Sequence, residues 1–285
     1  MEETYRFQDE FHKSLTGNKI DLPIGIMDSG LGGLSVMKEA LRIMPQEDFI
    51  YFGDSANAPY GTRPREEIKR LTYNVVEKLL DMGIKGLAVA CNTATSAAVK
   101  SLREDYPELP LVGIEPAVKP AVEHSEGGRI IIMATPMTIA QEKLRHLIDQ
   151  YQDQADLVPV ACDGLMEFVE RGDFDGRELD GYFEERLLPL LTDNTESIVL
   201  GCTHYPFLKP HLRAFLGDRR IELIDGSLGT ARELRRRLAV QGLLKPEAGQ
   251  QGVVTILNSA PGEEKVRMSR KLLQMDISDP GVPEG

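Results

Sequence analysis

Length, composition and charge exclude several classes of protein. The chain has 285 residues, of which 41% are hydrophobic, and its formal net charge is −12. This length suits two domains of ordinary size or one large domain. The negative charge argues against nucleic acid as the main partner, because phosphate binding requires a basic face. No apolar run is long enough to span a membrane, so we expect no membrane partner.

The N-terminal region and the cysteines indicate a cytoplasmic protein. Residues 1–21 are polar and mixed in charge and lack the apolar stretch of a secretory signal, so we expect a mobile or helical extension there. The three cysteines are Cys91, Cys162 and Cys202. An odd number of cysteines in a long chain without an export signal argues against a disulfide framework. We therefore expect free thiols in the cytosol.

Apolar runs and amphipathic stretches alternate through the first half of the chain. The runs predict strands at 24–28, 49–52, 87–91 and 111–115. The stretches between and after them predict helices at 34–44, 65–82, 92–105 and 116–124. A glycine turn at 29–33 precedes the first helix, and a long polar loop at 53–64 precedes the second.

The second half repeats this alternation. Strands are predicted at 129–135, 157–162, 198–202, 221–225 and 253–257. Helices are predicted from Pro136, at 165–171, at 176–191 and after each of the last two strands. Residues 276–285 are expected to form a disordered tail.

This alternation predicts an α/β protein with mostly parallel sheets flanked by helices. Because both halves run strand, helix, strand, helix and then a strand ending at a cysteine, we expect two pseudo-symmetric domains with the active site in the cleft between them. The first domain is predicted to comprise residues 22–113 and 225–275. The second is predicted to comprise residues 114–224.

Cys91 and Cys202 each end a short apolar run, in the stretches LAVAC and SIVLGC. Ligand sites of open α/β sheets lie at the carboxyl ends of the strands. A helix that starts at such a cysteine lowers the pKa of its thiol and favours the thiolate. A buried cysteine is often only a small hydrophobic core residue, but two in the same context favour reactive thiols. Cys162 is followed by Asp163-Gly164, and we interpret it as structural.

His204 follows Cys202 at a spacing that allows it to hold the thiol as a thiolate. Cysteine and histidine are also zinc ligands. However, the chain lacks the C-x-x-C and H-x-x-x-H spacings of zinc sites, so we expect no metal.

The turn from Asp28 to Gly33 is a candidate substrate site. Its glycine spacing does not fit a dinucleotide-binding fingerprint. We expect its amides and Ser29 to hold a small carboxylate, while Asp28 exchanges a proton with a nearby thiol. The alternative is an Asp-Ser pair that only caps a helix. Pro59-Tyr60-Gly61 lies in a loop long enough to cover a cleft, where Tyr60 and backbone amides could contact a ligand.

Four motifs together resemble the bacterial glutamate racemases of the aspartate/glutamate racemase superfamily. They are DSGLGGLSV at 28–36, PYG at 59–61, ACNTAT at 90–95 and LGCTHYP at 200–206. They occur in the order typical of the family, and the resemblance covers residues 22 to 275. It implies two pseudo-symmetric α/β domains and a two-base racemase that needs no cofactor.

The resemblance also implies roles for single residues. Cys91 and Cys202 would be the catalytic acid/bases, assisted by Asp28 and His204 respectively, and Glu170 matches a further acid of the family. The residues implied to bind substrate are Asp28, Ser29, Tyr60, Gly61, Asn92, Thr93, Thr203 and His204. Asp225-Gly226-Ser227 stands where many members have Asp-Ser-Gly, so no ligand role is carried over to Ser227.

The expected reaction is the racemisation of L-glutamate to D-glutamate for peptidoglycan synthesis and cell-wall formation, by a homodimer. A thiolate and a thiol on opposite faces of an α-carbon can remove and return its proton in either direction. Alternatives within the superfamily are an aspartate or hydantoin racemase. A cysteine hydrolase using Cys202 and His204, or an amino-acid-binding module with two domains, would belong to other classes.

Overall fold

The chain divides into two compact units. The computed structural model describes residues 5–8, 17–247 and 250–278. The described residues of Met1–Ile114 and Ser227–Gln274 form the first unit, and those of Glu115–Gly226 and Met275–Gly285 form the second. The chain thus leaves the first unit once and returns to it. The points where the chain passes from one unit to the other lie within two residues of the domain boundaries predicted from the sequence. That the two units are separate domains stays a prediction.

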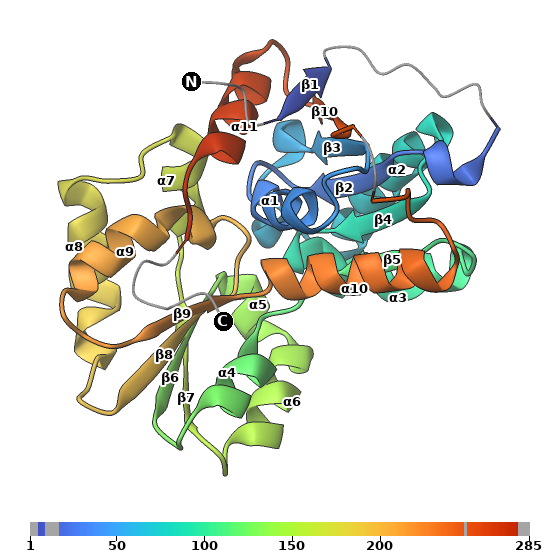
Figure 1. Cartoon of the computed structure of the whole chain (residues 1–285). Helices are drawn as coiled ribbons and strands as arrows, with labels where there is room; N and C mark the ends of the chain where they lie inside the picture. The colour runs from blue at the N-terminus through green and yellow to red at the C-terminus, as the bar shows by residue number, and fades with distance from the viewer. Residues whose placement is uncertain (1–4, 9–16, 248–249, 279–285) are drawn as a thin grey trace. The chain divides into compact units, whose positions relative to one another are not determined.

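The described part of the first unit is built on a six-stranded parallel sheet in the order β1-β10-β3-β2-β4-β5 (Figure 1). Its strands are β1 (Arg6–Gln8), β2 (Ile24–Asp28), β3 (Phe49–Gly53), β4 (Gly86–Val89), β5 (Leu111–Gly113) and β10 (Val253–Asn258). Every residue of β2, β3 and β4 is buried, as expected for parallel strands covered on both faces.

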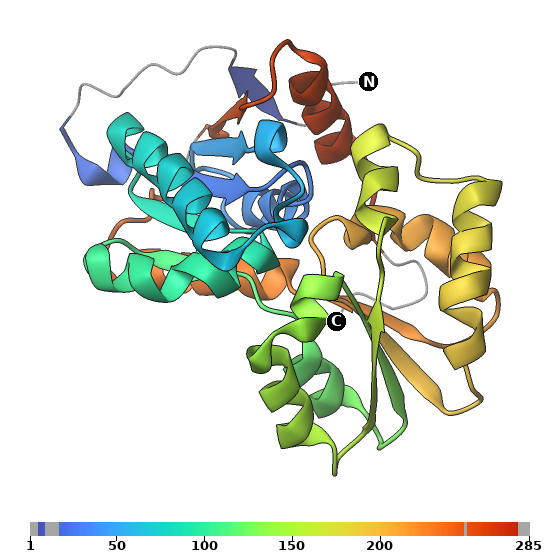
Figure 2. The ribbon, with the colours of Figure 1, turned by 180° about the vertical axis from the view of Figure 1, so that it is seen from behind.

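Helices cover both faces of this sheet. On one face lie α1 (Leu34–Ile43), α10 (Ser227–Val240) and α11 (Glu264–Gln274), and on the other lie α2 (Arg65–Met82) and α3 (Asn92–Asp105); Figures 1 and 2 show the two faces. The direction of winding reverses after β3, and right-handed crossovers then place α2 and α3 opposite α1. The short helices η1 (Lys19–Asp21), η2 (Ser55–Asn57) and η3 (Tyr60–Thr62) lie in the loops.

The described part of the second unit is a four-stranded parallel sheet in the order β7-β6-β8-β9. Its strands are β6 (Arg129–Ala134), β7 (Asp156–Ala161), β8 (Thr195–Leu200) and β9 (Glu222–Asp225). Its helices are α4 (Val118–His124), α5 (Pro136–Ala140), α6 (Glu142–Tyr151), α7 (Leu165–Arg171), α8 (Arg177–Arg186), η4 (Leu188–Leu190), η5 (Tyr205–Leu208) and α9 (Lys209–Leu216). Apolar residues of α4 and α6 pack against β6 and β8.

The two sheets repeat one topology. In the first unit β2 pairs with both β3 and β4, and β5 extends the sheet, which gives the order 3-2-4-5. In the second unit β6 pairs with both β7 and β8, and β9 extends the sheet, which gives 7-6-8-9. The strands β1 and β10 are additions to the first sheet. By this equivalence β2 corresponds to β6, and β4 corresponds to β8. The α/β class and the internal duplication predicted from the sequence are confirmed.

The expectation of a mobile or helical extension is wrong for residues 6–8. This segment forms the edge strand β1, which pairs in parallel with β10, while residues 1–4 and 9–16 lie outside the described residues. Three residues are too few to show a periodic pattern, and the strand depends on a partner from the other end of the chain. Phe7 also packs against Arg270, whose guanidinium lies 5.0 Å from the ring centroid.

Other predicted boundaries shift. The strands predicted at 87–91 and 198–202 end at Val89 and Leu200, so neither cysteine is a strand residue. The helix predicted at 176–191 divides into α8 and η4, because Pro189 cannot continue the hydrogen-bonding pattern of α8.

In the predicted disordered tail, Ile277 is buried, and residues 279–285 lie outside the described residues. None of the described helices is both long and apolar enough to cross a membrane.

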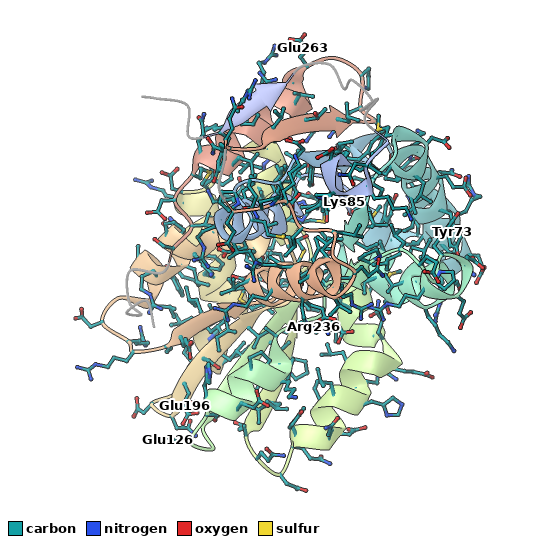
Figure 3. The ribbon with its side chains drawn as sticks, turned by 45° about the vertical axis from the view of Figure 1, so that its right-hand side comes forward. Tyr73, Lys85, Glu126, Glu196, Arg236 and Glu263 are labelled. Atoms are coloured by element: carbon teal, nitrogen blue, oxygen red, sulfur yellow. The ribbon has the colours of Figure 1, made fainter. Side chains whose placement is uncertain are left out.

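A buried ion pair lies at the amino ends of the strands of the first sheet. Lys85 precedes β4, and its ammonium donates to Glu47 at 2.5 Å and to the carbonyl of Ile20 at 2.6 Å (Figure 3). Both side chains of the ion pair are fully buried. The other carboxylate oxygen of Glu47 accepts a hydrogen bond from the amide of Lys245 at 2.7 Å. Burial lowers the pKa of Lys85, and the contact with Glu47 opposes this shift.

Replacing Lys85 by Met should therefore lower the free energy of unfolding by about 3 kcal/mol, because it leaves a buried carboxylate without its counter-ion. Urea denaturation measures the change. The control is Arg42→Ala, which removes an exposed pair with Glu39 on α1 and should change stability by less than about 1 kcal/mol. Equal losses in the two variants would contradict the assignment of Lys85 as a structural ion-pair partner.

Candidate active site

The first candidate half-site lies where the winding direction of the first sheet reverses. Asp28 ends β2, and Cys91 follows Val89 and Ala90 after the neighbouring strand β4. The amide of Ala90 donates to the carbonyl of Met27 at 2.8 Å, which fixes these two strand ends together. Ligands of open α/β sheets bind at such reversal points, outside the carboxyl ends of the strands.

Cys91 caps the N-terminus of α3. Its Sγ accepts a hydrogen bond from the amide of Ala94 at 3.4 Å and lies 3.4 Å from the hydroxyl of Ser29. The side chain is 7% exposed. Because a helix N-terminus favours negative charge, this position suits a thiolate.

The glycine turn after β2 holds Asp28 close to this thiol. Asp28 is fully buried, and one of its carboxylate oxygens accepts a hydrogen bond from the amide of Gly30 at 2.8 Å. A Cβ at Gly33 would lie 2.7 Å from the Cβ of Asp28 and 2.9 Å from that of Ala90. Only glycine therefore allows the start of α1 to approach both strand ends.

The hydroxyl of Tyr60, a predicted ligand contact, is engaged within its own loop. The ring is 1% exposed, and the hydroxyl donates to Asp54 at 2.7 Å. Burial raises the pKa of Tyr60, and the bond to Asp54 raises it further, so the group stays a phenol. Beside it, a Cβ at Gly61 would meet no atom within 4 Å. The backbone at Gly61 therefore borders open space in which a ligand could lie.

Asn92 and Thr93 begin α3 directly after Cys91. The side-chain Oδ1 of Asn92 is buried and has no hydrogen-bond partner among the described residues. Thr93 is buried as well. A buried acceptor without a partner is unfavourable unless a ligand supplies the donor, and an ammonium group would do so.

The second half-site repeats the first at the equivalent strand. Cys202 follows Leu200 and Gly201 after β8, and the amide of Gly201 donates to the carbonyl of Met133 on β6 at 2.7 Å. This bond is the counterpart of the one between Ala90 and Met27. The register therefore makes Cys202 the counterpart of Cys91.

A chain of three side chains ends at this second thiol. The Sγ of Cys202 lies 3.7 Å from Nδ1 of His204, and Nε2 of His204 lies 2.9 Å from a carboxylate oxygen of Glu170 on α7. Burial opposes the charged imidazolium, but the hydrogen bonds to Cys202 and Glu170 outweigh it and raise the pKa of His204 well above its usual value. Thr203, between Cys202 and His204, is buried.

The two half-sites differ in their acids. The residue of β6 that corresponds to Asp28 is Ala134, and the carboxylate of Glu170 connects to the second thiol through His204. Thr135 corresponds to Ser29 and caps α5, with its hydroxyl 3.0 Å from that of Thr138. Neither threonine is among the site residues predicted from the sequence, although the polar residue between β6 and Pro136 was a usable signal.

Comparisons with known proteins decide the family. Residues 24–234 match the family model described as Asp/Glu/Hydantoin racemase. The chain belongs to this racemase family. A glutamate racemase of Clostridium novyi (strain NT) is 49% identical over 253 residues, which are 88% of this chain and 97% of that protein. The chain is thus an amino-acid racemase, and the hydrolase and binding-module alternatives are set aside.

Solved structures of racemases share the fold. Glutamate racemase isoform RacE1 from Bacillus anthracis superposes with a TM-score of 0.78 at 30% identity, covering 90% of this chain and 96% of that one. Glutamate racemase from Francisella tularensis subsp. tularensis SCHU S4, in complex with D-glutamate, gives 0.75 at 27% identity, covering 90% and 95%.

Cys162, Asp225 and Ser227, to which the sequence assigned no catalytic or ligand role, have structural surroundings. Burial raises the pKa of Cys162 to about 12, so it stays a thiol, which supports its structural interpretation. Asp225 pairs with Lys209 at 2.7 Å, and the hydroxyl of Ser227 donates to Ser35 at 3.2 Å. Within the described residues, no three His, Cys, Asp or Glu side chains cluster as metal ligands.

Replacing Glu170 by Gln should lower the pKa of His204, because it removes the carboxylate charge. A histidine whose folded pKa is raised adds stability below its unfolded pKa of about 6.5 and loses that contribution as the pH rises through the folded value. The difference in unfolding free energy between wild type and E170Q should therefore be largest below pH ~6.5 and shrink at higher pH. Urea denaturation at several pH values measures it, and a difference independent of pH would contradict the raised pKa.

Proposed function

We propose that the racemase interconverts L- and D-glutamate without a cofactor, using Cys91 and Cys202 as two bases on opposite faces of the α-carbon. The main support is the equivalence of the two cysteines, each of which follows the third strand of a repeated α/β unit. A two-base reaction requires one acid/base on each face of the α-carbon, and a repeated unit can supply two of the same kind. The proposal requires that one substrate molecule meets both thiols.

The proton balance of this mechanism is simple. One cysteine, as thiolate, removes the α-proton and becomes a thiol. The other cysteine, as thiol, donates a proton to the opposite face of the resulting carbanion and becomes a thiolate. The product leaves with inverted configuration, and the two thiols have exchanged protonation states. This form of the enzyme acts on the product enantiomer, and proton exchange with solvent restores the form that acts on the first enantiomer.

Separate acids serve the two thiols in this proposal. Asp28 and Ser29 would assist Cys91, whose Sγ lies 3.4 Å from the hydroxyl of Ser29. His204, held by Glu170, would assist Cys202 and stabilise its thiolate as an imidazolium. Because the two sets of groups differ, we expect kcat and KM to depend on pH differently for the two enantiomers, while their ratio stays equal because the equilibrium constant is one.

The substrate would be held by neutral hydrogen-bonding groups. Oδ1 of Asn92, which lacks a partner among the described residues, would accept from the substrate ammonium. The hydroxyls of Ser29, Thr93 and Thr203, with the backbone at Tyr60 and Gly61, would hold the carboxylates. Thr135 and Thr138 are additional candidates at the matching edge of the second sheet.

Glutamate is proposed over aspartate because relatives near half identity, such as that of Clostridium novyi, are glutamate racemases. A cytoplasmic location, a role in peptidoglycan synthesis and a homodimeric state belong to the same proposal.

The direct test incubates the purified protein with L-glutamate in D2O in the presence of EDTA and without added pyridoxal phosphate. Proton NMR follows loss of the α-proton, and circular dichroism follows loss of optical activity. Decay of both signals with L-glutamate but not with L-aspartate supports the proposal. Reaction of aspartate alone would keep the two-thiol mechanism and change the substrate.

Single cysteine variants test the mechanism. Cys91→Ser and Cys202→Ser should each reduce the rate of racemisation at least ~100-fold, because each removes one acid/base. Each should retain exchange of the α-proton better from one enantiomer than from the other, with opposite preferences. The matched control is Cys162→Ser, which should racemise at the wild-type rate. Full activity of C91S or C202S would rule out the two-base mechanism.

A further inference from the structure

Asp54 is a buried carboxylate to which the sequence analysis gave no role. It follows Gly53 at the end of β3, next to the strand that carries Asp28. Its amide donates to the carbonyl of Asp28 at 2.9 Å, and its side chain is only 3% exposed. The backbone of Asp54 is therefore fixed to the strand end that bears the acid beside Cys91.

The carboxylate of Asp54 organises the loop that follows. One oxygen accepts from the hydroxyl of Tyr60 at 2.7 Å, and both oxygens lie 3.1 Å from the side-chain nitrogen of Asn57. The carbonyl of Asn57 in turn accepts from Nε of Arg63 at 2.9 Å. Together these bonds connect the start, the middle and the end of the loop to one carboxylate.

We propose that Asp54 is a positioning residue for catalysis, which holds Tyr60 and Gly61 in register with Asp28 and Cys91. This inference rests on the proposed function, because it takes the backbone at Tyr60 and Gly61 as a substrate contact. Asp54 connects to both sides of the half-site, through its backbone to Asp28 and through its side chain to Tyr60. A displaced loop would weaken binding of the substrate without altering either thiol.

The chemistry of the pair suits a fixed support rather than a proton carrier. Both oxygens of Asp54 are engaged by donors, and Tyr60 remains protonated because burial and the bond to Asp54 raise its pKa. A phenol that stays protonated keeps its donor directed at Asp54. Charge-assisted bonds of this kind are also stronger than bonds between neutral groups.

The chain contains a matched control for this interaction. Tyr73 on α2 donates to Asp105 on α3 at 2.5 Å, so it makes the same type of bond in the same unit. That bond is exposed, and Tyr73 lies on the outer side of α2 (Figure 3). Tyr73→Phe therefore removes a tyrosine–aspartate hydrogen bond without touching the loop.

The experiment measures kcat and KM of Tyr60→Phe, Asp54→Ala, the double variant and Tyr73→Phe, with L- and D-glutamate. Y60F and D54A should raise KM about tenfold for both enantiomers and change kcat much less, because a contact kept throughout the reaction contributes uniform binding. The double variant should have the KM of D54A alone, because both changes break one connection. Y73F should keep the wild-type KM.

A second measurement separates this inference from the proposed function. Hydrogen exchange of the amides at 60–62, without substrate, should be faster in Y60F and D54A than in wild type and Y73F. If wild type does not racemise glutamate, the proposed function fails, and exchange alone tests the support given by Asp54. Unchanged exchange in Y60F and D54A would overturn the inference, as would a wild-type KM in both variants when wild type racemises glutamate.

Discussion

Both candidate half-sites depend on one backbone hydrogen bond, made at the same point of each unit. The amide of the residue before each cysteine donates to the penultimate residue of the neighbouring strand. Ala90 donates to Met27 of β2, and Gly201 donates to Met133 of β6. Parallel strands have no hairpin to fix their ends, so this bond decides where the pairing stops and the chain is free to turn. The position of each thiol follows from that stop, because the cysteine is the second residue after the strand in both units.

The same repeated framework carries two different acid systems. In the first unit the central strand itself ends in a carboxylate, Asp28, which accepts from the amide of Gly30. In the second unit that place is taken by Ala134, and the carboxylate comes from α7 through an imidazole. A repeated fold thus constrains where the thiols stand but not which groups surround them. In the proposed mechanism, a reaction that interconverts mirror images would be carried out by two thiols with different neighbours.

The parts of the molecule that the sequence could predict are those coded locally. The strands before Cys91 and Cys202 are short buried apolar runs, and the same pattern of an apolar run followed by a cysteine occurs twice. The fold class and the places of the two thiols after strands were therefore predictable. β1 was not, since its three residues depend on β10, which lies far along the chain. Glu170, the partner of His204, is 34 residues away; the family resemblance named it as an acid, but no local pattern pairs it with that imidazole. Asp54 was missed because a single aspartate in a polar loop looks solvent-exposed, and only the folded loop shows it to be buried.

The interrupted first unit has a consequence for the order of folding during synthesis. The second unit is nearly continuous, from Glu115 to Gly226, and its sheet can form as soon as β9 has left the ribosome. The first sheet must wait, because β10 lies between β1 and β3 and is the last strand to be made. Until then β1 has no neighbour and the outer edge of β3 is open to other chains. The half-site of Cys91, although encoded first, therefore sits in the sheet that is completed last.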